Sequence, residues 1–187
     1  MISARTVDSA FVISALDAEL RRWRFERCDE QHLPQGLTEL RKLYWRGPDD
    51  TCPWTTLLVS DIQNVFETAY CLSKSLANIP VVASRTYSYE LWQFKAYLGE
   101  ECVLRVGDDA DHELKWLPRP LEAERVQSLA QQLHGGLIFE RFLRSLISGA
   151  PDRQACRQGL ELSSLDQGFP QMAARPSAEW HFASWQR

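Results

Sequence analysis

An alternation of apolar and polar side chains over residues 92–106 constrains the fold of this chain most. Apart from Glu100, the even-numbered side chains of the stretch are apolar, namely Trp92, Phe94, Ala96, Leu98, Cys102, Leu104 and Val106. A period of two is typical of strands with one buried face, and Gly99 with Glu100 interrupts it near the middle. The stretch therefore predicts a β-hairpin that hides its even-numbered side chains.

The turn of this hairpin has to keep the even-numbered side chains of both strands on the same face of the sheet. Directly opposed residues of an antiparallel pair point to the same face, so a shift of one residue would bury charge. A two-residue turn would pair Phe94 with Arg105. A three-residue connection over 99–101 pairs Leu98 with Cys102 instead, and we expect this connection or a β-bulge.

Helical periodicity flanks the hairpin on both sides. Apolar spacing predicts helices over 8–24, with Asp8 as N-cap, and over 60–78, where Ser60 and Gln63 form a capping box. Further helices are expected over 121–133, 137–147 and 152–162, and strands over 55–59 and 80–84. The tail is expected to be irregular and to lie against the domain with its aromatic side chains, Phe169, Trp180, Phe182 and Trp185.

These elements predict one α+β domain over residues 1–187. It has a small, mainly antiparallel sheet covered on one face by helices, and a helical C-terminal third. A chain of 187 residues with 44% hydrophobic and 25% charged residues has the size and composition of a single globular domain.

The composition also indicates where the protein is located and which partners it is not expected to bind. The sequence has no apolar run that could span a bilayer and no secretory signal, and its five cysteines form no C-x-x-C pair. We expect reduced thiols, a cytoplasmic protein and no membrane contact. The net charge of −4 and the absence of a basic stripe argue against nucleic-acid binding.

Acidic and tyrosine side chains gather around the predicted hairpin. Residues 90–113 hold seven carboxylates against Lys95 and Arg105, and the odd-numbered side chains face away from the apolar set. Clustered charge of one sign steers an oppositely charged partner. The alternatives are a hydrophilic tip that protects a sheet edge and packing under the C-terminal helices. The expected partner-binding residues are Tyr87, Tyr89, Gln93, Tyr97, Glu100, Glu101, Asp108, Asp109 and Asp111.

No catalytic or cofactor motif is legible. The sequence lacks G-x-S-x-G, a Walker loop, a dinucleotide glycine pattern and H-E-x-x-H. The acidic run 108–113 lacks the glycine and the glutamate that a calcium loop of the EF-hand type needs. We therefore expect no catalytic residue, no metal and no cofactor.

The layout of residues 55–113 resembles small bacterial immunity proteins, the partners of polymorphic and contact-delivered toxins. The resemblance runs through Leu-Leu-Val-Ser-Asp-Ile, the capped helix, Pro80-Val81-Val82 and the aromatic strand that turns at Gly99-Glu100. It implies a non-catalytic inhibitor that binds a basic toxin domain and needs no cofactor. Two alternatives stay open: a small, hydrolase-like enzyme with a site assembled from distant residues, and a chaperone or oligomeric scaffold.

Overall fold

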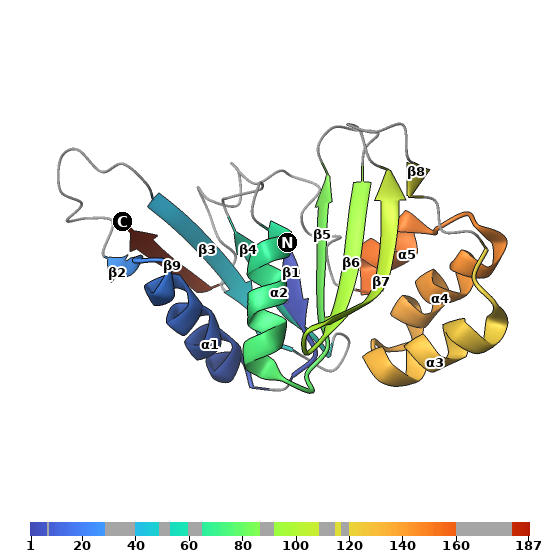
Figure 1. Ribbon diagram of the computed structural model, residues 1–187, viewed down its shortest axis with the longest axis horizontal. Helices are drawn as coiled ribbons and strands as arrows, with labels where there is room; N and C mark the ends of the chain where they lie inside the picture. The colour runs from blue at the N-terminus through green and yellow to red at the C-terminus, as the bar shows by residue number, and fades with distance from the viewer. Residues whose placement is uncertain are drawn as a thin grey trace.

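The computed structural model describes residues 1–6, 8–28, 40–48, 53–59, 65–86, 92–108, 115–116, 120–159 and 181–187 (Figure 1). The strands are β1 (Ile2–Ala4), β2 (Glu26–Cys28), β3 (Leu40–Arg46), β4 (Thr55–Val59), β5 (Val81–Thr86), β6 (Trp92–Leu98), β7 (Glu101–Asp108), β8 (Lys115–Trp116) and β9 (His181–Gln186). The helices are α1 (Ser9–Arg22), α2 (Val65–Leu76), α3 (Ala123–Leu133), α4 (Leu137–Ser145), α5 (Arg153–Gly159) and the 3-10 turn η2 (Leu146–Ser148).

The strands form one sheet in the order β2-β9-β3-β4-β1-β5-β6-β7-β8, in which neighbouring strands run antiparallel. β1 lies between β4 and β5, and β9 lies between β2 and β3. The expected α+β class with an antiparallel sheet is confirmed. The sheet is wider than the sequence indicated, because β1, β2 and β3 were not predicted as strands and residues 181–186 form a strand where an irregular tail was expected.

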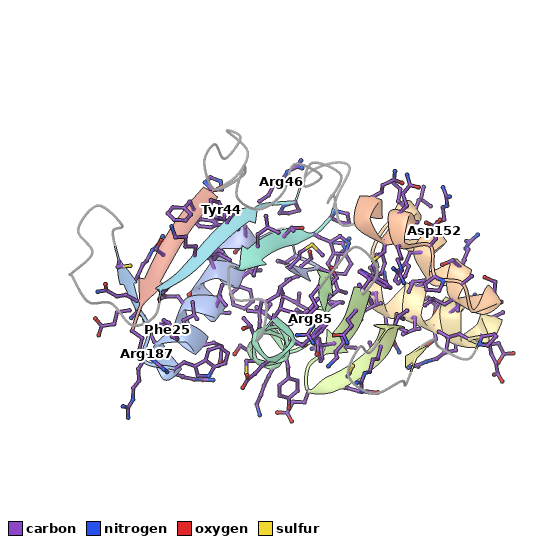
Figure 2. All side chains as sticks on the ribbon, turned by 90° about the horizontal axis from the view of Figure 1, so that it is seen from above. Phe25, Tyr44, Arg46, Arg85, Asp152 and Arg187 are labelled. Atoms are coloured by element: carbon purple, nitrogen blue, oxygen red, sulfur yellow. The ribbon has the colours of Figure 1, made fainter. Side chains whose placement is uncertain are left out.

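Helices lie on both faces of the sheet, so the expectation that they cover only one face was incomplete. α1 and α2 pack on one face, and α3, α4 and α5 pack on the other face over β5, β6 and β7 (Figures 1 and 2). β5 accordingly buries Val82 in the core under α3 and α4, and Val81 and Ala83 in the core under α1 and α2.

A β-bulge lets both strands of the β6–β7 hairpin bury the even-numbered side chains that lie away from the turn. Leu98 pairs with Glu101 across a two-residue turn, whereas Ala96 pairs with Leu104, so Val103 is the additional residue. The three-residue connection was wrong and the bulge is confirmed. Gly99 has φ 59, the backbone that a tight hairpin turn requires at its first central position.

The bulge also changes the position of Cys102. Cys102 pairs with Tyr97 rather than with Leu98, and it is exposed instead of lying in the core. The other expected core residues of the hairpin, Trp92, Phe94, Ala96, Leu104 and Val106, are buried under α3 and α4.

Several local predictions are confirmed. The Asp8 carboxylate accepts a hydrogen bond from the amide of Phe11 at 3.1 Å and caps α1. Trp185 is fully buried, as expected for an aromatic of the tail, whereas Phe182 is exposed. Phe169, Trp180 and the capping box at Ser60 lie outside the described residues.

Within the described part of the chain, no helix has the length and apolar character to cross a bilayer.

Candidate functional site

The residues expected to contact a partner fall into three groups. Tyr87, Tyr89, Asp109 and Asp111 lie outside the described residues, and Asp108 is the last residue of β7. Gln93 and Tyr97 are buried. Glu100 and Glu101 are exposed at the β6–β7 turn.

The open tyrosine surface expected on the odd-numbered side of β6 is not present at Gln93 and Tyr97, because α2 packs on this side. The Tyr97 hydroxyl donates to the carbonyl oxygen of Phe66 in α2 at 3.4 Å. The Gln93 side-chain oxygen accepts from Arg85 Nε at 2.8 Å. Burial raises the pKa of Tyr97, which therefore stays protonated.

Basic side chains line the same interface between α2 and the sheet. Lys95 Nζ and Arg85 Cζ lie 4.5 Å and 5.0 Å from the centroid of the Phe66 ring, within the range of cation–π contacts. Burial and the neighbouring Arg105 and Arg85 guanidinium groups lower the pKa of Lys95. Figure 2 shows Arg85 on the α2 side of the sheet. These side chains belong to the internal packing of the molecule.

An acidic patch extends along one face of α2, from its first turn to the β6–β7 turn beside its last turn. It consists of Glu67, Tyr70 and Lys74 on one face of α2, and Glu100 and Glu101 at the turn. Lys74 Nζ lies 2.7 Å from Glu100 Oε1, which joins the two elements. Three carboxylates against one ammonium group give the patch a net negative charge.

Tyr70 is the aromatic centre of the acidic patch. Its side chain is 38% exposed, and its ring packs on the buried ring of Tyr97 with a centroid distance of 6.1 Å. The sequence analysis did not select Tyr70. The available signal was its position in the helix, away from the apolar face formed by Val65, Ala69, Leu72 and Leu76.

The surface also has a groove between α3 and α4, with a volume of about 540 Å³. Such a volume is typical of sites that bind small molecules or a few side chains. The groove is lined by Ala123, Val126, Gln127, Ala130, Gln131, His134, Glu140, Arg144 and Ile147. Glu140 Oε2 and Arg144 Nη2 lie 3.7 Å apart across one turn of α4.

The groove carries polar and charged side chains that could bind a ligand or transfer protons. His134 and Glu140 could transfer protons, but the side chains that line the groove include no serine, threonine or cysteine nucleophile. In the described ranges, no group of three or more histidine, cysteine or acidic side chains could hold a metal ion.

Three of the four cysteine thiols in the described residues are poorly suited to nucleophilic attack. Burial is the largest cause of the raised pKa of Cys71, Cys102 and Cys156. The thiolate is the nucleophile, and a raised pKa reduces its population at neutral pH. These three thiols therefore give no support to a cysteine-dependent mechanism.

No protein-family model, curated protein or solved structure matches this chain. The fold defines an α+β protein with an acidic surface patch and a helix-lined groove. Its function is therefore argued from the geometry of these two surfaces.

Proposed function

We propose that this protein is a non-catalytic binding module for another protein and that the acidic patch is its contact surface. The observation that carries the proposal is the exposure of Glu100 and Glu101 at the β6–β7 turn, next to the helix that carries the exposed Tyr70, with the Lys74–Glu100 ion pair between the two elements. Exposed tyrosines surrounded by polar groups are frequent anchors of protein interfaces.

Rigidity supports this role for the patch. Tyr70 is carried by a helix and supported by Tyr97, and Glu100 and Glu101 are held by a two-residue turn between paired strands. A surface that is already ordered loses less conformational entropy on binding than a long loop does. Binding through this patch therefore requires little rearrangement of the described elements.

The charge of the patch selects the class of partner. We propose a basic protein domain, since opposite charges speed encounter and disfavour acidic competitors. The layout of residues 55–113 points to a bacterial toxin domain, which would make this chain an immunity protein that acts in the cytoplasm by stoichiometric binding. The proposed binding does not depend on a cofactor.

The experiment is co-expression of the chain with the product of each gene that flanks its own, in a bacterial host. Growth rescue by the wild-type chain and a one-to-one complex in light scattering would support the proposal. Replacement of Glu100 and Glu101 by lysine should weaken the complex at least about tenfold, because it places like charges at the contact. Tyr70→Ser should weaken it similarly through loss of the aromatic anchor.

The matched control is the double variant Glu26→Lys, Glu122→Lys, which makes the same charge change at two exposed positions on β2 and before α3. It should leave the affinity within about twofold of wild type, because Glu26 lies on an edge strand at the other end of the sheet from β6 and β7, and neither residue belongs to the acidic patch. Equal losses in both double variants would show that net charge alone matters, and an unaffected complex in both would reject the acidic patch.

A second candidate, a small hydrolase-like enzyme, draws on His134 and Glu140 in the α3–α4 groove. Activity against a panel of ester, amide and phosphoester substrates that is lost in His134→Ala and in Glu140→Gln would favour it. The same activity retained in both variants would assign it to a contaminant.

A further inference from the structure

The outer side of α4 and η2 carries more exposed apolar surface than the other described elements. Six large hydrophobic side chains are exposed among the described residues, and Leu137, Ile138 and Ile147 belong to this one segment. Leu137 is 85% exposed. Single exposed hydrophobic residues are ordinary, but a group on one helix indicates a contact surface.

The internal packing of the helix does not account for these side chains. The inner side of α4 is already buried, because Phe139, Phe142, Leu143 and Leu146 are fully covered in the core over β6 and β7. At about 100° per residue, Leu137, Glu140, Arg144 and Ile147 fall within about 80° on the outer side. These four residues therefore form one outer stripe, and Ile138, at about 100° from Leu137 on the other side, lies outside it.

The order of residues along this stripe is self-complementary. Glu140 and Arg144 lie at equal distances in sequence on either side of Phe142, and so do Leu137 and Ile147. When two copies of α4 cross antiparallel about a two-fold axis at the level of Phe142, Glu140 faces Arg144 of the second copy and Leu137 faces Ile147 of the second copy. A two-fold contact requires this kind of pairing.

The charged side chains of the stripe can exchange their partners for those of the second copy. The Glu140–Arg144 ion pair is long, at 3.7 Å, and the Arg144 side chain is 76% exposed. Two glutamates and two arginines around the axis would alternate in charge. The groove beside the stripe has room for aliphatic side chains of the second copy, over a floor that includes Val126 and Ala130.

We infer that α4 and η2 form an isologous contact between two copies of this chain. The segment is twelve residues long, or about 18 Å. One helix of this length contributes a small interface, so the dimer is in concentration-dependent exchange, with a dissociation constant of roughly 10–100 μM. This inference concerns a different surface from the acidic patch and does not rest on the proposed function.

The experiment is sedimentation equilibrium of the full chain with two charge-reversal variants. Glu140→Arg surrounds the axis with four arginines, and Arg144→Glu surrounds it with four glutamates. Each variant alone should dimerise at least about tenfold more weakly than wild type, because like charges face each other. An equimolar mixture should form a heterodimer, since each arginine then faces a glutamate of the other variant.

Two further measurements keep the result independent of folding. Far-UV circular dichroism and thermal unfolding should show that both variants are folded. A heterodimer in the mixture would also show it, because the same two variants then form the contact. Arg21→Glu and Glu26→Arg make the same charge changes at exposed positions elsewhere and should dimerise as wild type does.

Three outcomes would overturn the inference. The first is a wild-type chain that stays monomeric at several hundred micromolar, well above the expected dissociation constant of roughly 10–100 μM. The second is single variants that dimerise like wild type. The third is a mixture of the two variants that forms no heterodimer. A monomeric wild type would leave the outer stripe of α4 to a different protein.

Discussion

Lys74 Nζ lies 2.7 Å from Glu100 Oε1, so that the last turn of α2 is joined to the turn between β6 and β7. The two residues are 26 positions apart in sequence, and neither was selected for this contact by the periodicity of its segment. The pair is exposed, with 56% and 65% of the two side chains accessible. Its role is to orient the acidic patch more than to stabilise the fold.

The Lys74–Glu100 pair predicts a titration effect. The hydrogen bond to Glu100 is the largest cause of the raised pKa of Lys74. Glu100→Gln removes the negative charge and should lower the pKa of Lys74 toward its ordinary value, which NMR titration of the Nζ resonance can measure. Glu101→Gln is the control and should have a smaller effect. Equal effects would show that the pair does not form in solution.

Two glycines of the hairpin predict different stabilities after substitution by alanine. Gly107 has φ 140, and an added Cβ would collide with the carbonyl oxygen of Trp92 and lie 2.7 Å from Gln93 Cα. Gly99 has φ 59, with Ala77 O at 3.4 Å. We expect Gly99→Ala to lower the free energy of unfolding by about 1–2 kcal/mol. Gly107→Ala should lower it by at least about 3 kcal/mol.

Denaturant unfolding of the two glycine variants provides the measurement. If Gly107→Ala is as stable as Gly99→Ala, the close approach of β6 and β7 at Gly107 is wrong.

The aromatic cluster under α4 predicts the largest core effect. Phe94 and Phe142 are fully buried with ring centroids 5.1 Å apart, and both also contact Phe139. Phe142→Ala should lower the free energy of unfolding by about 3–5 kcal/mol, because it leaves a cavity between helix and sheet. Phe182→Ala, at a 37% exposed position on β9, is the matched control and should cost less than half as much. A cost that is the same at both positions would contradict the described core.

The buried Cys156 thiol predicts a loss of stability at alkaline pH. Burial raises its pKa in the folded chain, with a smaller contribution from Asp152, so the folded state keeps the proton. In the unfolded chain the thiol ionises near its ordinary pKa of about 8.5. Above this pH the unfolded state binds fewer protons, and the free energy of unfolding falls by up to about 1.4 kcal/mol per pH unit through this thiol.

The comparison with Cys156→Ala isolates this contribution. The slope of unfolding free energy against pH, between about 8.5 and 10, should be shallower in Cys156→Ala than in wild type. Cys102→Ala, at an exposed position, should change the slope less. Parallel curves for wild type and Cys156→Ala would show that the thiol ionises in the folded protein.

The hairpin shows what the sequence could predict. The even-numbered apolar side chains from Trp92 to Val106 identify the buried face, because burial on one side of a strand imposes a period of two. Even-numbered residues of the two strands must be opposite one another for both to face the core. The additional residue Val103 in β7 brings them opposite one another. The tight turn at Gly99 was missed, since parity alone does not distinguish a longer connection from a bulge.

The location of Tyr97 shows what the sequence could not predict. The polar and amphipathic residues Gln93, Lys95 and Tyr97 look like an open face in a single strand, but α2 comes back over this face after β4, and Gln93 and Tyr97 are buried. This coverage depends on where β1 enters the sheet, and three residues at 2–4 carry too little pattern to indicate a central strand. The groove at Arg144 likewise arises from two helices that were predicted separately.

The positions of β1 and β9 have a consequence for the order of folding. β1 pairs with residues 55–57 and 81–83, and β9 separates β2 from β3, so strands that are distant in sequence are neighbours in the sheet. During synthesis on the ribosome, β2 and β3 remain without their common neighbour until residues 181–186 have emerged. Such distant pairings slow folding and leave strand edges open to other nascent chains, which makes completion of the C-terminal strand the step that protects the newly made protein from aggregation.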